Sequence, residues 1–484
     1  MSSTTKELAE VYANTDALGL AALVKQKQIS PLELLEVAID AVETLNPQLN
    51  AVTQKAYELA RTEASKVPLT SVFAGVPFLL KDLATAAAGM QTTNSCRYYK
   101  KYNPVSTADN EAVRRMRAAG LVPFGFTNVP ENGWALTTES VLNGPARNPW
   151  NPQLTPGGSS GGAAAAVASR MVPLAEGSDG AGSIRMPASV CGLVGLKPSR
   201  GRITVAPATD FWHGGAVFLC LSRSVRDTAA YLDAVGGALT GEPYALPLPE
   251  TSFSAQALAR PGKLRCAFSV SLPGGGEVDP EVAQAIRMTA LQIEALGHSI
   301  EEHDLEFDVE NSWRAYRHMI AVQAAVQFAD AASTFGHPLT RDDVEPYTWA
   351  NIEKGRSIDG MQHAKDIDTL RSAGVKIAQN VEPFDVFITP VMRRTAFPLG
   401  SACKMGVGDY EAYNAEFLPD TAFLFPFNVS GQPGISLPLH SSSAGLPIGV
   451  QLVGRLGGEG TLLQLATALE EAHSWHGRCP GIRY

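Results

Sequence analysis

Short apolar runs and amphipathic stretches alternate along the chain, in the order strand, helix, strand. Residues 76–80 are continuously apolar and end at Lys81-Asp82, which is typical of a buried strand that carries a charged pair at its carboxyl end. A helical pattern over residues 110–119 is followed by an apolar run at 121–126. This alternation predicts an α/β fold with parallel strand pairs and helices packed on the sheet. Further strands are expected at 172–175, 264–270, 384–389, 434–438 and 449–454, and further helices at 58–66, 160–170, 225–235, 280–296 and 461–472.

The first long amphipathic stretch has a clear start. Ser30, Pro31 and Glu33 predict a helix with Ser30 as N-cap, proline in the first turn and glutamate closing a capping box. The apolar face that follows breaks at Asn46-Pro47, where we expect the helix to end because proline interrupts helices.

The chain shows no internal repeat or low-complexity linker, so we expect one continuous domain over residues 1–484. Residues 311–380 are mostly helical and richer in aromatic and charged side chains. We interpret this stretch as a cap over the site, in which substrate selectivity would lie. Chemistry is not expected there because the stretch lacks glycine-rich turns.

Composition narrows the class of protein. Of the 484 residues 45% are hydrophobic, enough for a large core, and the net charge of −9 comes from mixed acidic and basic residues. We therefore expect no nucleic-acid or membrane partner and take a neutral small molecule as the substrate. The first 16 residues are polar, and no apolar run approaches the roughly 20 residues that span a bilayer. Six scattered cysteines are typical of a reducing compartment, so we expect a cytoplasmic protein.

Two glycine-rich loops bracket an alanine-rich, helix-length segment. Residues 156–162 read PGGSSGG and residues 177–187 read GSDGAGSIRMP. Each loop holds a serine between glycines, and glycine lets a ligand approach main-chain N–H groups closely. Acyl transfer needs such an arrangement, with serine as nucleophile and N–H groups around the oxyanion. Two ordinary loop turns are the competing interpretation, which the pairing of the loops weakens.

Other motifs do not fit these loops. Residues 157–161 satisfy G-x-S-x-G, but the proline-rich segment 147–156 cannot be the central strand that a hydrolase elbow requires. No GK[ST] ends either loop, which excludes a P-loop. No histidine lies beside the loops, and the pair His473/His476 is interpreted as a surface pair rather than a zinc site. Lysine is then the alternative base for the serine, and we expect neither a metal nor another cofactor.

With these motifs the chain is identified as a member of the amidase signature family of serine hydrolases. The resemblance covers nearly the whole chain, with a signature core at about 71–205. It implies a single large α/β domain with a mixed, largely parallel, twisted central sheet covered by helices on both faces. It also implies a Ser-Ser-Lys triad of Lys81, Ser159 and Ser183, and a cis peptide bond between Gly158 and Ser159. The matching motifs are GVPFLLKDL (75–83), FTN (126–128), the two glycine-rich loops, CGLVGLKPSRG (191–201) and GLPIGVQLVG (445–454).

The chemistry of such a triad depends on an uncharged lysine. A lysine of ordinary pKa, about 10.4, is protonated at pH 7, but desolvation at the end of a buried strand can lower that pKa by several units. Lys81 would then take a proton from Ser159, which takes one from Ser183, and Ser183 attacks the amide carbonyl to form an acyl-enzyme. The oxyanion is expected to be stabilised, by about 3 kcal/mol for each donor, by the N–H groups of Gly180, Ala181, Gly182 and Ser183.

Five residues are assigned supporting roles. We interpret Asp179 and Arg185 as a pair that fixes the nucleophile loop. Asp82 is expected to orient the lysine or to cap the next element, with a solvated charge as the alternative. Asn128 is expected to form hydrogen bonds with main-chain groups rather than to bind substrate. Ser160 is the fifth residue assigned a supporting role.

Two positions depart from the family pattern. Ala181-Gly182 stands where the family commonly has two glycines. Alanine keeps its N–H, so the cradle is retained if φ at Ala181 is negative. Phe126 stands where many members carry lysine, which puts a local salt bridge in doubt and leaves the triad unchanged.

The substrate is less well defined by the sequence. Flanking phrases at 147–151, 187–198 and 427–438 are similar to those of bacterial amidases that open 6-aminohexanoate cyclic dimers. Aryl acylamides, carbamates (urethanes) and esters stay open, because the same acyl-enzyme chemistry cleaves them. A glutaminase subunit of a tRNA-dependent amidotransferase is the second hypothesis, and it would need a partner protein.

An aromatic cluster follows the signature region. We expect Phe211 and Trp212, with His213 beside them, to border the acyl pocket, against core packing as the alternative. Cys191 is assigned to the same pocket. The partner is otherwise a small-molecule amide, and a homodimer stays open.

Overall fold

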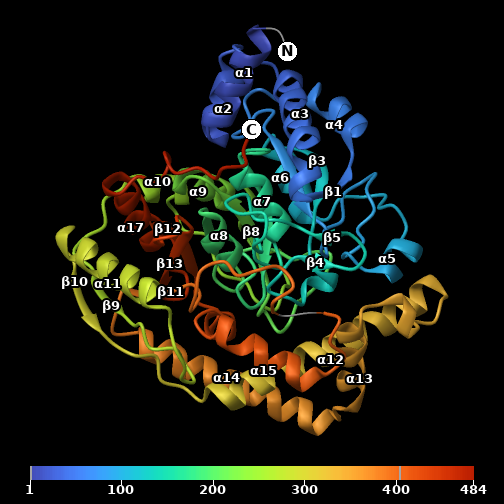
Figure 1. The fold of residues 1–484 in the computed structure, drawn as a ribbon, viewed down its shortest axis with the longest axis vertical. Coiled ribbons are helices and arrows are strands. Elements are labelled where there is room, and N and C mark those ends of the chain that lie inside the picture. Colours follow the sequence, from blue (N-terminus) through green and yellow to red (C-terminus); the bar gives the residue numbers. More distant parts are fainter. Residues whose placement is uncertain (1–2, 403–404) are drawn as a thin grey trace.

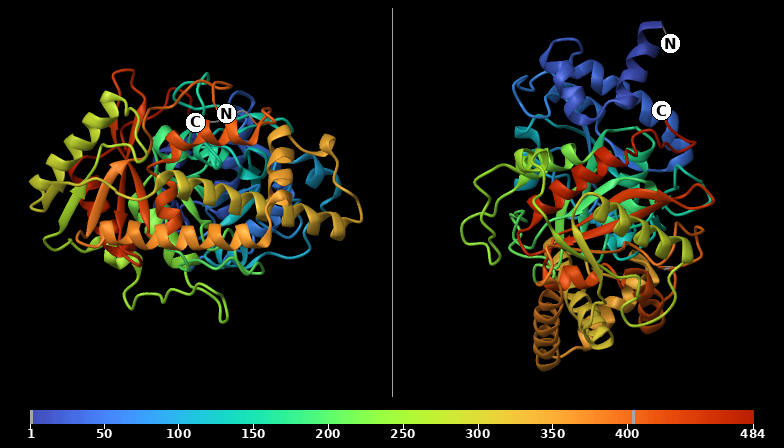
Figure 2. Two further views of the ribbon diagram at one scale, coloured as in Figure 1. Left: turned by 90° about the horizontal axis from the view of Figure 1, so that it is seen from below. Right: turned by 90° about the vertical axis from the view of Figure 1, so that its left-hand side faces the viewer.

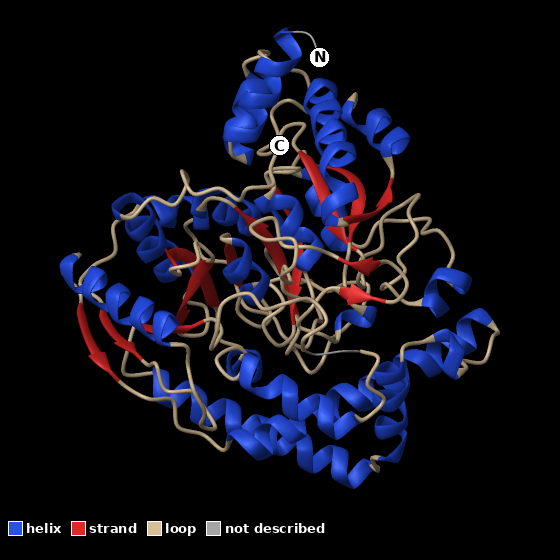
Figure 3. Ribbon diagram, viewed as in Figure 1, coloured by secondary structure: helices blue, strands red, loops and turns tan. Residues whose placement is uncertain are grey.

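In the computed structural model, which describes residues 3–402 and 405–484, a mixed sheet of eleven strands crosses the molecule between helices (Figures 1 and 3). A separate two-stranded pair is formed by β4 (Glu139–Ser140) and β5 (Gly144–Pro145). The α/β fold class is confirmed. Across the large sheet the strands are β1 (Val52–Lys55), β3 (Val122–Thr127), β2 (Pro77–Lys81), β6 (Leu174–Asp179), β8 (Val217–Ser222), β7 (Val194–Lys197), β12 (Gly434–Ser441), β13 (Pro447–Gly454), β11 (Val386–Pro390), β9 (Arg265–Phe268) and β10 (Ser299–Glu302).

The sheet is mixed, as expected, but it is not largely parallel. The neighbours β3–β2–β6 and β11–β9–β10 are parallel, giving four parallel pairs. The other six neighbouring pairs among the described strands are antiparallel. A helical crossover makes consecutive strands parallel, whereas a tight turn makes them antiparallel. The strands β12 and β13 form such a hairpin, and β8 inserts antiparallel between β6 and β7, which the alternation of strands and helices did not reveal.

Helices cover both faces of the sheet. Successive side chains of a strand point to opposite faces. In β13, Gly449 lies against Ser189 of α8 (Arg185–Cys191), whereas the preceding Ile448 packs with Val282 of α11 (Pro280–Ala295). These two helices therefore lie on opposite faces. The remaining helices around the sheet are α1 (Ser3–Asn14), α2 (Ala17–Lys25), α3 (Pro31–Leu49), α4 (Tyr57–Ala64), α5 (Arg97–Tyr102), α6 (Glu111–Ala118), α7 (Gly161–Ala168), α9 (Val225–Val235), α10 (Phe253–Leu258), α16 (Phe425–Ser430) and α17 (Glu459–Ala472).

A layer of helices lies at the lower edge of the molecule as drawn in Figure 1, and the view from below in Figure 2 shows it crossing the core. It consists of α12 (Val309–Phe335), α13 (Pro346–Ser357), α14 (Gly360–Val381) and α15 (Tyr410–Thr421). The helix α12 packs against both α13 and α14. The expectation that residues 311–380 are helical is therefore confirmed.

All the strands and helices expected from the sequence pattern are present, with shifted ends. Ser30 and Glu33 form the expected capping box. The helix does not end at Asn46, however, but continues through Pro47 to Leu49. The strand expected at 172–175 is β6, and it extends to Asp179 because its polar residues are buried too.

Within the described ranges, none of the helices combines the length and the hydropathy needed to cross a bilayer. The five cysteines that the structure describes are free thiols, and four of them are buried. The sixth, Cys403, lies outside the described residues.

Gly162 in the first turn of α7 lies directly against main chain. Its N–H donates to the Asn128 carbonyl at 3.1 Å, and a Cβ at this position would collide with the main chain of Asn128 and Ala51. Because no flexible side chain can move aside, we expect Gly162→Ala to lower the free energy of unfolding by about 3 kcal/mol in urea denaturation. The control Gly262→Ala meets no atom within 4 Å and should change it by less than about 0.5 kcal/mol. Equal effects of the two variants would contradict this account of α7.

Candidate active site

Lys81 is the last residue of β2, and its amine is buried among hydroxyl groups. The residue is 1% exposed, and Nζ lies 2.8 Å from Oγ of each of its three serine contacts. Burial lowers the pKa of Lys81 to about 7, although the charges of Glu176 and Asp179 oppose the change. At neutral pH, Lys81 is therefore uncharged in a large fraction of the protein molecules. The three serines are Ser159, Ser160 and Ser178.

Ser159 lies in the first glycine-rich loop, in closely packed main chain. The Gly158–Ser159 peptide bond is cis, as the family resemblance implies. A Cβ on Gly158 would come within 2.8 Å of the Thr137 nitrogen, so only glycine fits there. The N–H of Ser160 donates to the carbonyl of Ser183 at 3.3 Å. The two glycine-rich loops therefore touch each other beside the lysine amine.

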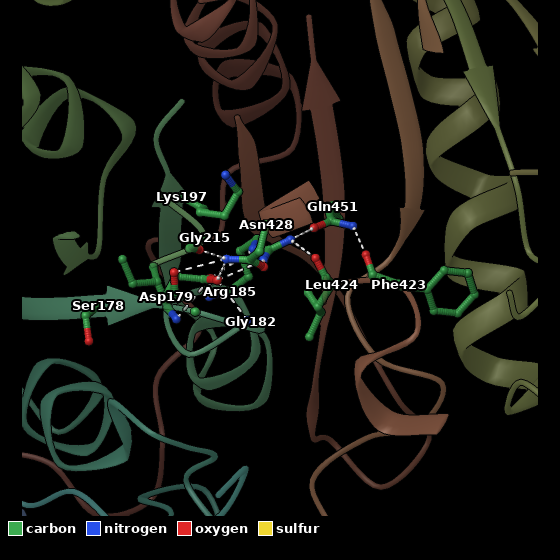
Figure 4. Close-up of polar contacts among 12 residues, drawn as sticks. Ser178, Asp179, Gly182, Arg185, Lys197, Gly215, Phe423, Leu424, Asn428 and Gln451 are labelled. Carbon is green, nitrogen blue, oxygen red and sulfur yellow. Dashed lines mark hydrogen bonds and ion pairs between the residues drawn. The ribbon is translucent and has the colours of Figure 1, made fainter. Parts of the chain in front are cut away.

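Asp179 organises the loop that carries Ser183 (Figure 4). Its carboxylate accepts the N–H of Gly182 at 2.8 Å and that of Ile184 at 3.2 Å, and it pairs with the guanidinium of Arg185 at 2.8 Å. Burial opposes ionisation of Asp179, but the charge of Arg185 and the hydrogen bonds hold the pKa of this carboxyl below its usual range. The carboxylate therefore stays charged and holds the loop on both sides of Ser183.

Arg185 connects this loop with the C-terminal part of the sheet. Its guanidinium donates to the carbonyl of Leu424 at 3.1 Å and to the side-chain oxygens of Gln451 and Asn428 at 2.7 Å. Asn428 in turn donates to the carboxylate of Asp179 at 3.0 Å. Figure 4 shows the resulting chain of contacts from the nucleophile loop to β13. Asp179 and Arg185 thus form the expected pair, inside a larger network.

The main chain before Ser183 has free N–H groups. Ala181 does not adopt a positive φ, which meets the condition set above for keeping the cradle, while Gly182 has a φ of +116°. Within the described residues, the N–H groups of Ala181 and Ser183 have no acceptor. The N–H of Gly182 differs from the expectation, because it already donates to Asp179.

A cavity of about 220 Å³ lies beside the nucleophile loop. The ring of Trp212 lies against Gly180, where a Cβ would collide with it, and it meets the Tyr316 ring edge-on at 6.4 Å. The hydroxyl of Tyr316, from α12, donates to the carbonyl of Gly180. The helical layer therefore contributes directly to this region. The cavity is lined by Arg200, Trp212, His213, Gly215, Tyr244, Tyr316, Met319, Ile367, Leu370, Arg371, Asn428 and Val429.

Two residues expected in the pocket do not line the cavity beside Trp212. Phe211 packs on Phe218 of β8, with ring centroids 5.8 Å apart, and does not line this cavity. Cys191 ends α8, about 9 Å along the helix from Arg185. It lines a different cavity, of about 360 Å³. Of the expected pocket residues, Trp212 and its neighbour His213 line this cavity, whereas Phe211 and Cys191 do not.

The other supporting residues have structural contacts. Oδ1 of Asp82 accepts the N–H of Thr93 at 2.6 Å, so Asp82 caps the following turn and is not a solvated charge. Asn128 donates to two main-chain carbonyls at 3.1 Å, as expected. Ser160 contacts the lysine amine. No group of three His, Cys, Asp or Glu side chains that could hold a metal occurs in the described part of the chain.

Sequence reasoning missed four residues of this region. Glu176 and Ser178 lie on β6 and contact Lys81, but the expected strand stopped before them. Their spacing of two on a strand that leads into the second glycine-rich loop could have revealed them. Tyr316 and Asn428 reach the loop from distant parts of the sequence, and no local pattern marks them.

Comparisons with known proteins agree with one another. The family model described as Amidase matches residues 33–463. The 6-aminohexanoate-cyclic-dimer hydrolase of Paenarthrobacter ureafaciens is 40% identical over 477 residues, 96% of each chain. A solved 6-aminohexanoate cyclic dimer hydrolase superposes with a TM-score of 0.93 at 39% identity, covering 97% of this chain and 99% of that one. A bacterial aryl acylamidase of the amidase signature family gives a TM-score of 0.86 at 28% identity, covering 96% and 97%.

The Asp179–Arg185 pair leads to a stability prediction. Both side chains are fully buried, so Arg185→Met would leave a buried carboxylate without its cation. We expect the free energy of unfolding at pH 7 to fall by about 3–5 kcal/mol in urea denaturation. The control is Arg371→Met, in an exposed ion pair with Asp368, for which a change below about 1 kcal/mol is expected. A small loss for Arg185→Met would show that the pair does not hold the loop.

Proposed function

The chain belongs to the amidase family of amide hydrolases, and on this basis we propose that it cleaves carboxylic amides through Lys81, Ser159 and Ser183. Ser183 is the nucleophile and carries the acyl group, Ser159 relays the proton, and Lys81 is the base. The reaction consumes one water and releases an acid and an amine or ammonia.

The observation that carries this proposal is the environment of the Lys81 amine. Nζ is buried, contacts the hydroxyl of Ser159 at 2.8 Å, and has a pKa lowered to about 7 by desolvation. In the part of the chain that the structure describes, Lys81 forms no ion pair with a carboxylate within 4.0 Å. An uncharged amine in this position can accept a proton from a hydroxyl, which an ordinary surface lysine at pH 7 cannot do.

The proposed reaction proceeds in three steps. Lys81 takes the proton of Ser159, Ser159 takes the proton of Ser183, and Oγ of Ser183 attacks the carbonyl carbon. The tetrahedral oxyanion then collapses and breaks the C–N bond, while the proton returns through Ser159 to the leaving nitrogen. Water attacks the acyl-enzyme by the same relay and regenerates Ser183.

The oxyanion is stabilised in this proposal by main-chain donors of the nucleophile loop. The N–H groups of Ala181 and Ser183 lack other acceptors in the described structure, and that of Gly180 lies beside them. Each such donor is worth about 3 kcal/mol in the transition state. Gly182 is assigned a different task, because its N–H is bound by Asp179. Its positive φ lets the chain turn there, so it shapes the cradle without donating to the oxyanion.

We propose that the cavity beside Trp212 accepts part of the substrate and that residues 311–380 act as its cap. Support comes from Tyr316 and Met319 of α12, which line this cavity together with Trp212. The lining combines aromatic and aliphatic side chains with a few polar groups, namely Arg200, His213, Arg371 and Asn428, which fits a small aliphatic, cyclic or aryl amide. The resemblance to 6-aminohexanoate-cyclic-dimer hydrolases makes that cyclic dimer the first substrate to test.

The triad predicts the effects of three substitutions. Ser183→Ala should abolish turnover, because the nucleophile is lost, and Lys81→Ala should lower kcat/KM by about 10³-fold or more. Ser159→Ala should lower kcat/KM by a similar factor, since this substitution breaks the proton relay. The control Ser169→Ala removes a buried hydroxyl that donates only to Ala166, and it should retain near-normal activity. Substantial activity of Lys81→Ala at pH 7 would overturn the assignment of the base.

A substrate panel with the isolated chain tests the reaction class. We expect hydrolysis of amides, with the 6-aminohexanoate cyclic dimer and aryl acylamides cleaved faster than carbamates and esters of similar size. Product acid and amine are quantified by mass spectrometry, with Ser183→Ala as the blank. Activity on free glutamine alone, or only with a co-purified second protein, would favour the amidotransferase subunit instead.

A further inference from the structure

The main chain of Lys81 has an unusual hydrogen-bond partner. The strands β2 and β6 are joined by a single parallel bridge, between Leu79 and Ala175. Two residues further on, the N–H of Lys81 donates to Oε2 of Glu176 at 2.8 Å rather than to a main-chain carbonyl of β6. A buried N–H without an acceptor would cost about 1–3 kcal/mol. The side chain of Glu176 therefore replaces the missing part of the ladder.

Glu176 is itself an unusual residue for this place. It is 1% exposed, and its carboxyl also accepts the hydroxyl of Thr85 at 3.1 Å. Burial raises the pKa of Glu176 to about 7, against the N–H of Lys81, the hydroxyl of Thr85 and the charge of Lys81, which all lower it. An apolar residue or an asparagine could have filled the strand at a smaller cost in desolvation. A purely structural role thus leaves the charge unexplained.

We propose, on the basis of the proposed function, that Glu176 is a positioning residue of this site. Its carboxyl holds the main chain of the base where the β2–β6 ladder stops, and its charge, when the carboxyl is ionised, acts on the amine. The residue does not touch the substrate and acts through Lys81 alone.

The charged and titratable groups around the pair are few. Lys81 experiences the charges of Glu176 and of Asp179, and the second of these is already neutralised by Arg185. Glu176 faces Tyr231 of α9, and its cross-strand neighbour is Cys220 of β8. Burial raises the pKa of both the Tyr231 hydroxyl and the Cys220 thiol, so both stay neutral near pH 7. Glu176 is therefore the principal variable charge that acts on the amine.

The sign of its effect follows from electrostatics. An ionised Glu176 stabilises the ammonium form of Lys81 and so raises the pKa of the amine. With both groups titrating near pH 7, the protons leave the pair in coupled steps. Removing the charge leaves Lys81 as a single, more acidic ammonium, and the uncharged base becomes available at lower pH.

The test is the pH dependence of nucleophile reactivity in Glu176→Gln. Glutamine keeps an oxygen that can accept the N–H of Lys81 and removes the charge. The rate of covalent modification by phenylmethylsulfonyl fluoride, followed by intact mass, needs the reactive serine but no particular amide substrate. In the wild type we expect this rate to fall below about pH 7. In Glu176→Gln the midpoint of this fall should move to lower pH by about 1 unit.

A second variant distinguishes the hydrogen bond that Glu176 accepts from the N–H of Lys81 from the effect of its charge. Glu176→Ala also removes the acceptor, so we expect the plateau rate at high pH to fall about tenfold or more, while Glu176→Gln keeps it within about threefold. If Glu176→Gln does not fold, Thr85→Val replaces it. That variant removes one hydrogen-bond donor to the carboxyl, so Glu176 becomes protonated at higher pH. The midpoint of the fall in modification rate should then also move to lower pH, but by a smaller amount than in Glu176→Gln.

Several outcomes overturn the inference. A midpoint that does not move in either charge-altering variant removes the electrostatic role. A rate that falls equally at all pH values in Glu176→Gln indicates packing alone, and an unchanged plateau in Glu176→Ala removes the positioning role. Failure of the proposed function is recognised separately, because the label would then fall on a serine other than Ser183 or persist in Lys81→Ala.

Discussion

Desolvation of one amine is the constraint on which the rest of this site depends. A lysine kept in water would be charged at neutral pH, and a lysine paired with a carboxylate would be charged more firmly still. Lys81 avoids both situations, because Nζ is buried and its nearest partners are three serine hydroxyls. The side chains that hydrogen-bond to Nζ are small and uncharged, which leaves the amine able to exchange a proton with a hydroxyl. This requirement explains why two glycine-rich loops and the ends of two strands converge on it.

The same region also contains a buried ion pair. Asp179 and Arg185 are completely buried and mutually neutralised, and they bind the loop main chain on both sides of Ser183. Such a pair contributes little net stability compared with apolar packing, but breaking it is costly. Its use here is geometric, because it connects the nucleophile loop with Asn428 and Gln451 in the C-terminal part of the sheet. Under the proposed function Lys81 needs an environment with little charge and Ser183 needs a rigid one, and different neighbours meet these two requirements.

The helical layer joins the chemistry to the substrate region. Tyr316 of α12 binds the carbonyl of Gly180 and also lines the cavity beside Trp212. A displacement of α12 would therefore alter both the cavity and the loop.

The sequence by itself determined the local elements and the residues proposed as the triad. Apolar periodicity located the strands and helices. The glycine-rich loops and the lysine after a buried strand carried the resemblance to the amidase signature family, which implies Lys81, Ser159 and Ser183 as the triad, because these signals lie within short segments. Only the tertiary structure decided the antiparallel centre of the sheet, the contacts of Glu176 and Ser178 with the lysine, and the approach of Tyr316 and Asn428 to the loop. It also separated Cys191 and Phe211 from the cavity. The physical reason is that these features depend on which distant segments become neighbours, and burial and pairing between such segments leave no periodic trace along the chain.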